Sequence, residues 1–201
     1  MNTKDKIMKS TFKLLLEKGL IDVSLSEIIK ESQVGYGSIY YYFEDKDQLI
    51  QTVLNRYIIE IFLNQLESIK LTDDLFHNLN EFYMKVLGLN EDYTYISYEN
   101  LSIDNSDFKK MILLTFEAQQ KYEKEQEFFN QYNIKFTSTI KDIINKGIKS
   151  NQVAGDINID EITELIKSNI YGIFFLWLIR DIEDVESSIK INVNYIMDVL
   201  T

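Results

Sequence analysis

The sequence predicts an all-α protein, and three observations favour this class. The 201 residues contain no proline and only seven glycines, so few residues can break a helix. Apolar residues recur every three or four positions through most of the chain, which is the helical period. Apolar and polar residues alternate as in a half-buried strand only in "YTYISY", residues 93–98, whose secondary structure therefore stays open.

Two short helices are expected at the start of the chain. The first runs from about Lys4 to Lys18 with apolar residues at helical spacing, and Gly19 is a suitable residue to end it. Ser24 then precedes Glu27 by three positions, which is the spacing of a capping box and predicts the start of the second helix.

A third and a fourth helix follow. "SQVGYG", residues 32–37, breaks the second helix, and a third short helix is expected over Tyr36–Tyr42. The fourth begins within "EDKDQL", residues 44–49, and its apolar positions continue to about Lys70.

The rest of the chain is also predicted to be helical, and the fourth helix joins the two parts directly. We therefore expect two domains, residues 1–48 and residues 49–201. "NQVAGDIN", residues 151–158, separates two long helices. The remaining helices are expected at 73–89, 91–103, 106–118, 119–150, 159–180 and 184–200.

Composition excludes several classes of protein. With no cysteine and one histidine, the chain has no thiolate metal site, disulfide framework or pair of histidine ligands. Its longest apolar run, Tyr171–Ile179, is shorter than the roughly 18 residues that span a bilayer, and residues 1–10 lack the apolar stretch of a signal peptide. We expect a cytoplasmic protein without membrane, cofactor or metal. We do not expect an enzyme, because the chain has no cysteine, a single histidine and no recognisable pair of carboxylates.

The net charge of −11 is unevenly distributed. Residues 1–48 hold seven lysines and eight acidic residues, a balance of −1, whereas residues 49–201 hold 14 basic and 24 acidic residues, a balance of −10. The acidic total argues mildly against a nucleic-acid partner, but the nearly neutral first part permits contact with DNA.

The second and third helices have the pattern of a helix-turn-helix, since both are short and a tight turn joins them. Three consecutive tyrosines, Tyr40–Tyr42, cannot all face one core, so at least one lies at the surface. Gly37 would let a backbone approach a phosphate closely, and the hydroxyls of Ser38 and Tyr40–Tyr42 suit contacts to phosphate and sugar. Lys46 stands at the start of the next helix, where it is either a phosphate contact or a solvated lysine.

These residues resemble the DNA-binding head of the TetR family of bacterial regulators. The resemblance covers about the first 50 residues and is strongest in "GSIYYYF" with a lysine three positions later. It is carried by Ile7, Ser10, Thr11, Leu14, Leu15, Glu17, Gly19, Ser24, Ile28, Val34, Gly37, Ser38, Ile39, Tyr40, Tyr41, Phe43, Lys46 and Leu49.

The resemblance implies a role for each residue of the head. Tyr36, Gly37 and Ser38 would begin the recognition helix in the major groove. Tyr40, Tyr41 and Lys46 would hold the DNA backbone, and Ser24 would reach a phosphate from the second helix. Tyr42 belongs to the same DNA-binding set. In this family the remaining residues form a divergent helical domain that binds a small ligand and makes a homodimer.

Several positions depart from the family pattern. Gln33 replaces the usual turn glycine, Gly35 the usual serine cap, Tyr36 an often basic residue and Tyr42 a common histidine. The recognition helix has no Lys or Arg, so it cannot make a bidentate arginine–guanine contact. We expect readout of an A·T-rich site by tyrosine packing, backbone N–H groups and DNA shape, with modest affinity because few phosphates are neutralised.

The C-terminal part is rich in aromatic residues, which either form the core or line an apolar ligand pocket between helices. Glu99 and Glu117 are either surface carboxylates or groups that meet a cationic ligand there. The candidate ligand-binding residues are Tyr83, Phe116, Tyr132, Phe136 and Trp177.

The last two helices have wide apolar faces, one over Ile162–Trp177 and one over Ile189–Leu200. One face of each would pack on its own domain and the other on a second copy, giving a four-helix homodimer interface, unless the whole bundle is formed within one chain. The sequence thus predicts a ligand-responsive transcriptional repressor, released from its double-stranded DNA operator by a small apolar or aromatic effector. The alternative is a dimeric helical ligand-binding or interaction protein that does not bind DNA.

Overall fold

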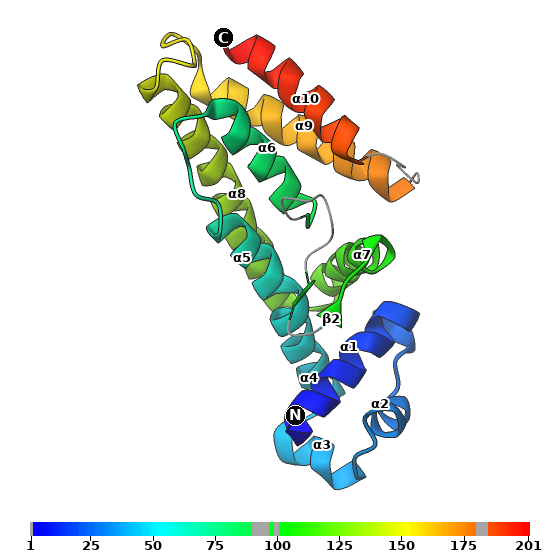
Figure 1. The fold of residues 1–201 in the computed structure, drawn as a ribbon. Coiled ribbons are helices and arrows are strands. Elements are labelled where there is room, and N and C mark those ends of the chain that lie inside the picture. The colour runs from blue at the N-terminus through cyan, green and yellow to red at the C-terminus, as the bar shows by residue number, and fades with distance from the viewer. Residues whose placement is uncertain (1, 90–96, 99–100, 180–184) are drawn as a thin grey trace. The chain divides into compact units, whose positions relative to one another are not determined.

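The structure, a computed structural model, describes residues 2–89, 97–98, 101–179 and 185–201 and is predominantly helical there, as the sequence predicts (Figure 1). The helices are α1 (Thr3–Asp22), α2 (Leu25–Ser32), α3 (Tyr36–Tyr42), α4 (Lys46–Leu54), the π-helical segment η1 (Asn55–Ile59), α5 (Glu60–Glu67), α6 (Leu75–Val86), α7 (Asn105–Lys121), α8 (Glu123–Lys149), α9 (Ile159–Ile179) and α10 (Val185–Leu200).

The chain divides into two compact units. Unit 1 comprises residues 1–61 and 97–129, and unit 2 comprises residues 62–96 and 130–201. Helices α1 to α4, η1 and α7 belong to unit 1, and α6, α9 and α10 belong to unit 2. The predicted domain boundary after residue 48 follows the extent of the helix-turn-helix head, and it stays a prediction.

The helix predicted for residues 91–103 is wrong where the structure describes that segment. Ser97–Tyr98 (β1) and Leu101–Ser102 (β2) pair as two short antiparallel strands. Aromatic residues favour extended backbone, which is consistent with the alternation at 93–98. The other residues of this segment, 90–96 and 99–100, including most of "YTYISY", lie outside the described residues.

Helix α1 is the central helix of the head. Its apolar residues, among them Ile7, Phe12 and Leu15, are buried and contact the other helices of unit 1. Gly19 has a φ of 81°, a left-handed value that glycine adopts readily, and it interrupts the regular helix at the predicted end. One further turn continues to Asp22.

Helix α2 begins with the predicted capping box. The Glu27 N–H donates to Ser24 Oγ at 3.3 Å, and the Ser24 N–H donates to Glu27 Oε2 at 3.0 Å. Lys18 of α1 also forms an ion pair with Glu27. The same carboxylate therefore caps α2 and joins it to α1.

Helix α4 passes through a π-helical turn before it continues as α5. The single long helix predicted for this segment is thus helical to Glu67 but changes hydrogen-bond pattern at η1. Tyr57 of η1 is buried, and its ring stacks on Phe12 of α1 with centroids 5.1 Å apart. Such π turns inside α-helices occur frequently at functional sites.

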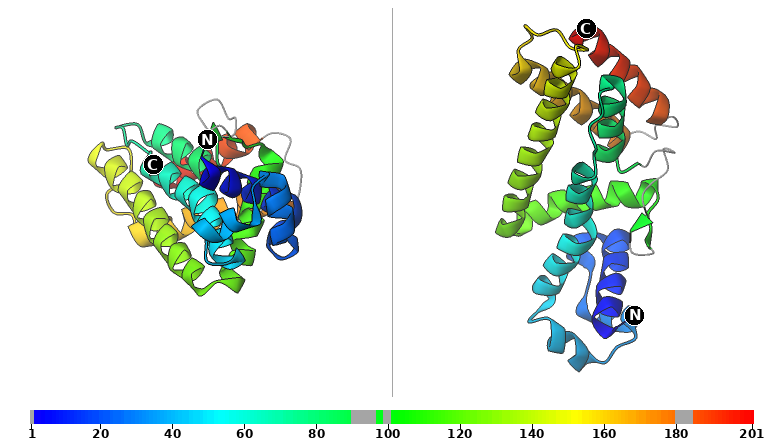
Figure 2. Two further views of the ribbon diagram at one scale, coloured as in Figure 1. Left: turned by 90° about the horizontal axis from the view of Figure 1, so that it is seen from below. Right: turned by 60° about the vertical axis from the view of Figure 1, so that its left-hand side comes forward.

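The core of unit 2 is formed by apolar residues from α6, α8, α9 and α10. Phe82 of α6 and Phe136 of α8 have ring centroids 5.1 Å apart. Helices α9 and α10 lie side by side in the views of Figures 1 and 2, and Ile166 and Val193 are buried on them.

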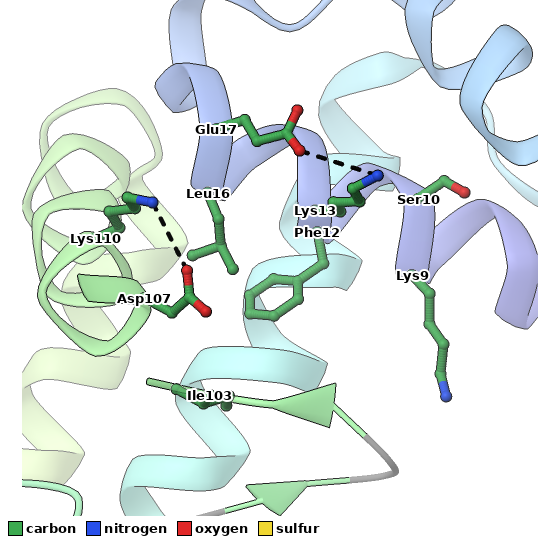
Figure 3. Close-up of a pocket in the computed structure, with 9 residues that line it drawn as sticks. All are labelled: Lys9, Ser10, Phe12, Lys13, Leu16, Glu17, Ile103, Asp107 and Lys110. Atoms are coloured by element: carbon green, nitrogen blue, oxygen red, sulfur yellow. Dashed lines mark ion pairs between the residues drawn. The ribbon is translucent and has the colours of Figure 1, made fainter. Parts of the chain in front are cut away.

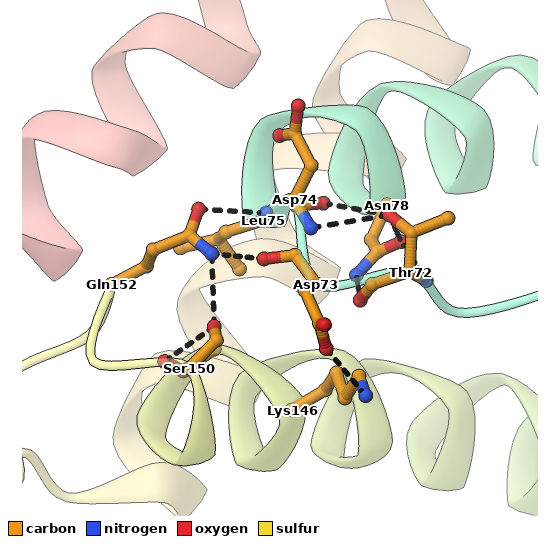
Figure 4. Close-up of polar contacts among 9 residues, drawn as sticks. Thr72, Asp73, Asp74, Leu75, Asn78, Lys146, Ser150 and Gln152 are labelled. Carbon is orange, nitrogen blue, oxygen red and sulfur yellow. Dashed lines mark hydrogen bonds and ion pairs between the residues drawn. The ribbon is translucent and has the colours of Figure 1, made fainter.

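The connection between α5 and α6 is fixed to the C-terminal end of α8 by polar contacts (Figure 4). Lys146 Nζ and Asp73 Oδ1 lie 2.7 Å apart, and the Leu75 N–H donates to Gln152 Oε1 at 3.0 Å. The Gln152 side-chain amide also donates to the Asp73 carbonyl oxygen. These bonds satisfy backbone groups at the start of α6 and hold Leu75 against α8.

Gly147 of α8 packs closely against Leu75 and Val153. A Cβ atom there would be 2.6 Å from Val153 Cγ2 and 3.0 Å from Leu75 Cδ1. We predict that Gly147→Ala lowers the free energy of unfolding by about 1–2 kcal/mol, because overpacking costs more than the improved helix propensity returns. Urea unfolding followed by circular dichroism measures this. Gly37→Ala is the matched control, since no atom lies within 4 Å of its added methyl group, and equal loss in both variants would contradict the packing argument.

The Glu27 carboxylate predicts a pH dependence. The hydrogen bond from Lys18 and then those from Ser24 lower the pKa of Glu27 to about 2, from an ordinary value of 4.5. Because the folded pKa is depressed, this contribution to stability is complete above pH 4.5 and is lost as the pH falls towards 2.

Glu27→Gln keeps the capping oxygen and removes only the charge. We predict that wild-type protein melts at a higher temperature than this variant above pH 4.5, and that added salt shrinks the difference because the group is exposed. The two proteins should converge near pH 2. A difference that is constant over this pH range would show that the charge does not contribute.

Candidate nucleic-acid interface

Helix α3 presents its tyrosines to solvent. Ile39 and Phe43 are buried in the head, and the tyrosines on the other faces of this short helix are exposed. Tyr41 is the most exposed of them, with 80% of its surface accessible. This confirms the sequence inference that three consecutive aromatic residues cannot all face one core.

The tyrosine rings form two pairs. The hydroxyl oxygens of Tyr36 and Tyr40 lie 3.1 Å apart, and this hydrogen bond is the main cause that raises the pKa of Tyr40. The rings of Tyr41 and Tyr42 meet edge to face with centroids 4.8 Å apart. Each ring is thus supported by a neighbour, which limits the side-chain entropy lost when a partner binds.

Gly37 and Ser38 lie in the first turn of α3. Gly37 is exposed, and no atom lies within 4 Å of the position of an added Cβ. Packing within the chain therefore does not require glycine here. Ser38 is half-buried, and its N–H donates to the Gly35 carbonyl oxygen at 2.9 Å.

The turn before α3 shows the effect of two departures from the family pattern. Gln33 has a φ of 52°, the left-handed region that a glycine would adopt without strain. Gly35 is the N-cap of α3 and has no side chain to bond the free N–H groups of the first turn.

Ser24 and Lys46 both have partners within the head. The Ser24 hydroxyl donates to Glu27 Oε2 at 2.7 Å, and the Lys46 ammonium donates to the Val23 carbonyl oxygen. Lys46 thereby fixes the start of α4 to the loop before α2. The Lys46 ammonium has two further donors, so its contact with Val23 does not prevent a phosphate contact. The predicted phosphate contacts of Lys46 and of Ser24 both stay predictions.

Other lysines of the head are engaged by carboxylates. Lys13 Nζ lies 2.7 Å from Glu31 Oε1, and this hydrogen bond raises the pKa of Lys13. Lys18 is paired with Glu27, which raises the pKa of Lys18 in the same way. These pairs join α1 to α2 and reduce the positive charge that the head can offer to phosphates.

Helix α7 and its C-cap residue Tyr122 are joined to the head by three hydrogen bonds. Glu117 Oε2 accepts a hydrogen bond from the Leu20 N–H at 3.0 Å, next to the kink in α1. Asp47 Oδ1 accepts from Lys121 Nζ and from the Tyr122 hydroxyl, both at 2.8 Å. Lys121 is the main cause that lowers the pKa of Asp47, and burial raises the pKa of Tyr122 to about 12.

The sequence reasoning missed these contacts. Glu117 is an exposed carboxylate, as one of the two expectations has it, and it also accepts the hydrogen bond from Leu20. Glu99 lies outside the described residues. The partners are 97 and 74 or 75 residues apart, so no local pattern could have identified them.

The predicted ligand-binding residues are divided between the two units. Tyr132 and Phe136 pack together with ring centroids 5.9 Å apart, and Phe136 stacks on Tyr171 at 5.6 Å. Trp177 is buried and packs against Phe174. Phe116 lies on α7 in unit 1 and is half-exposed. Burial raises the pKa of Tyr132.

Tyr83 belongs to a polar network that connects three helices of unit 2. Its hydroxyl donates to Asn169 Oδ1 at 2.7 Å, and the Asn169 amide donates to Asn192 Oδ1 at 2.7 Å. Asn192 in turn donates to the Ser188 carbonyl oxygen. Burial raises the pKa of Tyr83, so the hydroxyl stays protonated and can donate. The network fixes the register of α6, α9 and α10, and its role in ligand binding stays a prediction.

Helices α9 and α10 each separate a buried from an exposed apolar face. Ile166, Ile170 and Trp177 are buried, and Phe175 is 62% exposed. By length and composition α9 could also cross a membrane, although the polar residues Asp160, Glu161, Glu164 and Lys167 lie along it. The other exposed apolar residues of the two helices are Leu165, Tyr171, Leu176, Ile179, Ile191, Tyr195 and Val199.

The described residues contain no cluster of three or more His, Asp or Glu side chains that could hold a metal ion. What the geometry of the head offers is a rigid, exposed, hydroxyl-rich helix. Such a helix can lie against a polyanionic surface and contact it through hydroxyls and ring faces.

Residues 7–53 match the family model described as "Bacterial regulatory proteins, tetR family". Over 57 residues the chain is 35% identical to an uncharacterized HTH-type transcriptional regulator of Lactococcus lactis subsp. lactis. This match covers 28% of this chain and 29% of that protein. It is 25% identical over 158 residues to the uncharacterized HTH-type transcriptional regulator YvdT of Bacillus subtilis (strain 168), which covers 77% of this chain and 71% of YvdT. The match to the first relative thus spans less than a third of its length.

A TetR transcription regulator from Haloarcula marismortui ATCC 43049 has a similar fold, with a TM-score of 0.74 at 20% identity, over 98% of this chain and 97% of that one. At this identity the similarity concerns the fold. The family and the names of the relatives are those of transcriptional regulators rather than enzymes. Residues 7–53 therefore carry the head that defines the TetR family of bacterial regulatory proteins.

Proposed function

We propose that the chain is a cytoplasmic transcriptional repressor that binds double-stranded DNA through α3. The observation that carries the proposal is the arrangement of α3, in which two apolar residues anchor the helix and four tyrosines face outwards. Four of the seven residues of α3 are exposed tyrosines, and contact of their apolar rings with water is unfavourable. Such a surface favours binding to another molecule.

The position of Gly37 is consistent with DNA as the partner of this surface. Its side-chain position is open and exposed, so the fold gains nothing from glycine there, and glycine in a helix costs up to about 1 kcal/mol relative to alanine. The absence of a side chain is useful where a second backbone approaches closely. A DNA backbone beside the first turn of α3 would be such a neighbour.

The chemistry of α3 also limits how DNA is read. Without Lys or Arg, the helix offers hydroxyls and ring faces, which suit phosphates, sugars, thymine methyl groups and groove shape. We therefore propose an A·T-rich operator and modest affinity, since Lys13 and Lys18 are already paired with carboxylates.

We further propose that the repressor is a homodimer and is released from its operator by a small apolar or aromatic effector. Response to a ligand is typical of the family. A ligand that binds one arrangement of the two heads more tightly would shift their spacing away from two successive major grooves. The predicted effector residues Tyr83, Phe116, Tyr132, Phe136 and Trp177 await a test.

The second candidate is a dimeric helical ligand-binding or interaction protein that has lost DNA binding. The lack of cations on α3 and the internal partner of Lys46 favour it. The two candidates differ in whether the wild-type protein binds the operator at all, and the double variant Tyr41→Ala, Lys46→Ala tests the contact surface. The repressor should lose operator binding in this variant, whereas unchanged binding would show that α3 and the start of α4 are not the contact surface.

Gly37→Ala provides the sharper test of the proposed interface. We predict that it leaves the unfolding free energy unchanged or slightly raised, yet weakens operator binding by about tenfold or more, because its methyl group displaces the DNA backbone. Electrophoretic mobility shift with the chain's own upstream DNA measures this at several salt concentrations.

Gly155→Ala is the matched control, since that site is also open but lies in unit 2. Wild-type and Gly155→Ala protein should give the same salt-sensitive shift. No shift by wild-type protein at micromolar concentration would reject DNA binding, and an undisturbed shift by Gly37→Ala would remove α3 from the interface.

The exposed stripe on α9 and α10 supports the dimer. Phe175, Ile179 and Tyr195 are each more than half exposed, and Gly172 on α9 has no atom within 4 Å of an added Cβ, which would let a second helix approach closely. A homodimer that covers this stripe through a four-helix interface would also cover the exposed apolar face of α9.

We predict that Phe175→Glu converts the dimer into a monomer, because a carboxylate buried without a partner opposes association. Size-exclusion chromatography with light scattering measures the mass. Ile134→Glu on α8 is the control, since Ile134 is equally exposed but lies on neither of the last two helices. A monomeric wild-type protein, or a dimeric Phe175→Glu variant, would reject this interface.

A further inference from the structure

Unit 1 contains a cavity that the proposed function does not use (Figure 3). It has a volume of about 350 Å³ and lies between α1 and the segment from Ile103 to Lys110 at the start of α7. This volume is within the range of sites for small organic molecules. The cavity is distinct from the aromatic residues of unit 2 that the sequence predicts as an effector site.

The floor of the cavity is apolar and rigid. Phe12 and Ile103 form it and are buried, and Leu16 borders it from α1. The Phe12 ring stacks on Tyr57, which holds it in place from the other side. An apolar lining of this kind favours the hydrocarbon part of a ligand.

The rim is charged. Lys9, Lys13 and Lys110 line the cavity together with Glu17 and Asp107, and Lys13 is also paired with Glu31, which lies outside the lining. Lys110 Nζ lies 3.7 Å from Asp107 Oδ1, longer than a hydrogen bond, so its ammonium can turn towards a ligand without breaking one. The position of Lys110 at the rim thus suits contact with an anionic group.

We propose that this cavity binds a small amphipathic organic anion, a carboxylate with a short apolar body. The apolar body would lie on Phe12, Leu16 and Ile103. The carboxylate would accept a charge-assisted hydrogen bond from Lys110, with Lys9 as the second cation at the rim.

Binding there would affect η1, the segment of unit 1 that precedes the passage of the chain into unit 2. Tyr57, which supports the floor, belongs to the π-helical segment η1, and the chain passes from unit 1 to unit 2 between residues 61 and 62. A ligand that fixes Phe12 would therefore also fix η1. If the proposed function is correct, occupancy of the cavity would change operator affinity, because α1 is the helix on which α3 packs.

Isothermal titration calorimetry of the full chain with octanoate tests the site without DNA. We expect saturable binding of octanoate and much weaker binding of 1-octanol and octylammonium. Lys110→Gln should weaken octanoate binding about tenfold, the value of one charge-assisted hydrogen bond. Lys109→Gln, the same change one residue away and outside the cavity lining, should bind as wild type does.

Absence of saturable octanoate binding, or equal binding of octylammonium, would overturn the proposal. So would octanoate binding that survives Lys110→Gln but is lost in Tyr171→Ala, because the ligand would then lie in unit 2. Mobility shifts with and without octanoate form a separate experiment. If the chain binds no DNA but octanoate binding depends on Lys110, the repressor proposal fails and the site stands.

Discussion

The geometry of the head depends on the burial of two side chains, Ile39 and Phe43. A seven-residue helix is too short to be stable in water by itself, so tertiary packing must hold α3 in place. Because these two residues supply that packing, the rotation of α3 is fixed and the tyrosines between them must face outwards. The burial of only two side chains thus determines which surface of α3 is exposed for the proposed DNA contact.

The polar groups of the head are used mainly for its own assembly. Glu27 caps α2 and pairs with Lys18, while Lys46 bonds the Val23 carbonyl oxygen and Asp47 joins α4 to α7. These bonds make the head rigid, and they leave tyrosine hydroxyls and ring faces as its main outward chemistry. In the proposed DNA complex, such a head would depend on shape complementarity more than on net charge.

Local patterns predicted much of the fold and part of the site. The Ser24–Glu27 spacing located the start of α2, Gly19 located the kink in α1, and the run of tyrosines predicted an exposed α3. Each of these features depends on residues within a few positions of one another. The pairing of β1 with β2 was missed, because an isolated two-residue ladder has almost no periodicity to detect.

By itself, the sequence determined the helical class, the caps and the likeness of its head to the TetR family, since propensity, capping and motif spacing all act over a few residues. Only the tertiary structure decided that Glu117 caps Leu20, that Lys46 bonds Val23 and that Phe12 and Ile103 enclose a cavity between α1 and α7. These contacts join residues up to 97 positions apart, and they arise from how apolar faces pack rather than from any local pattern.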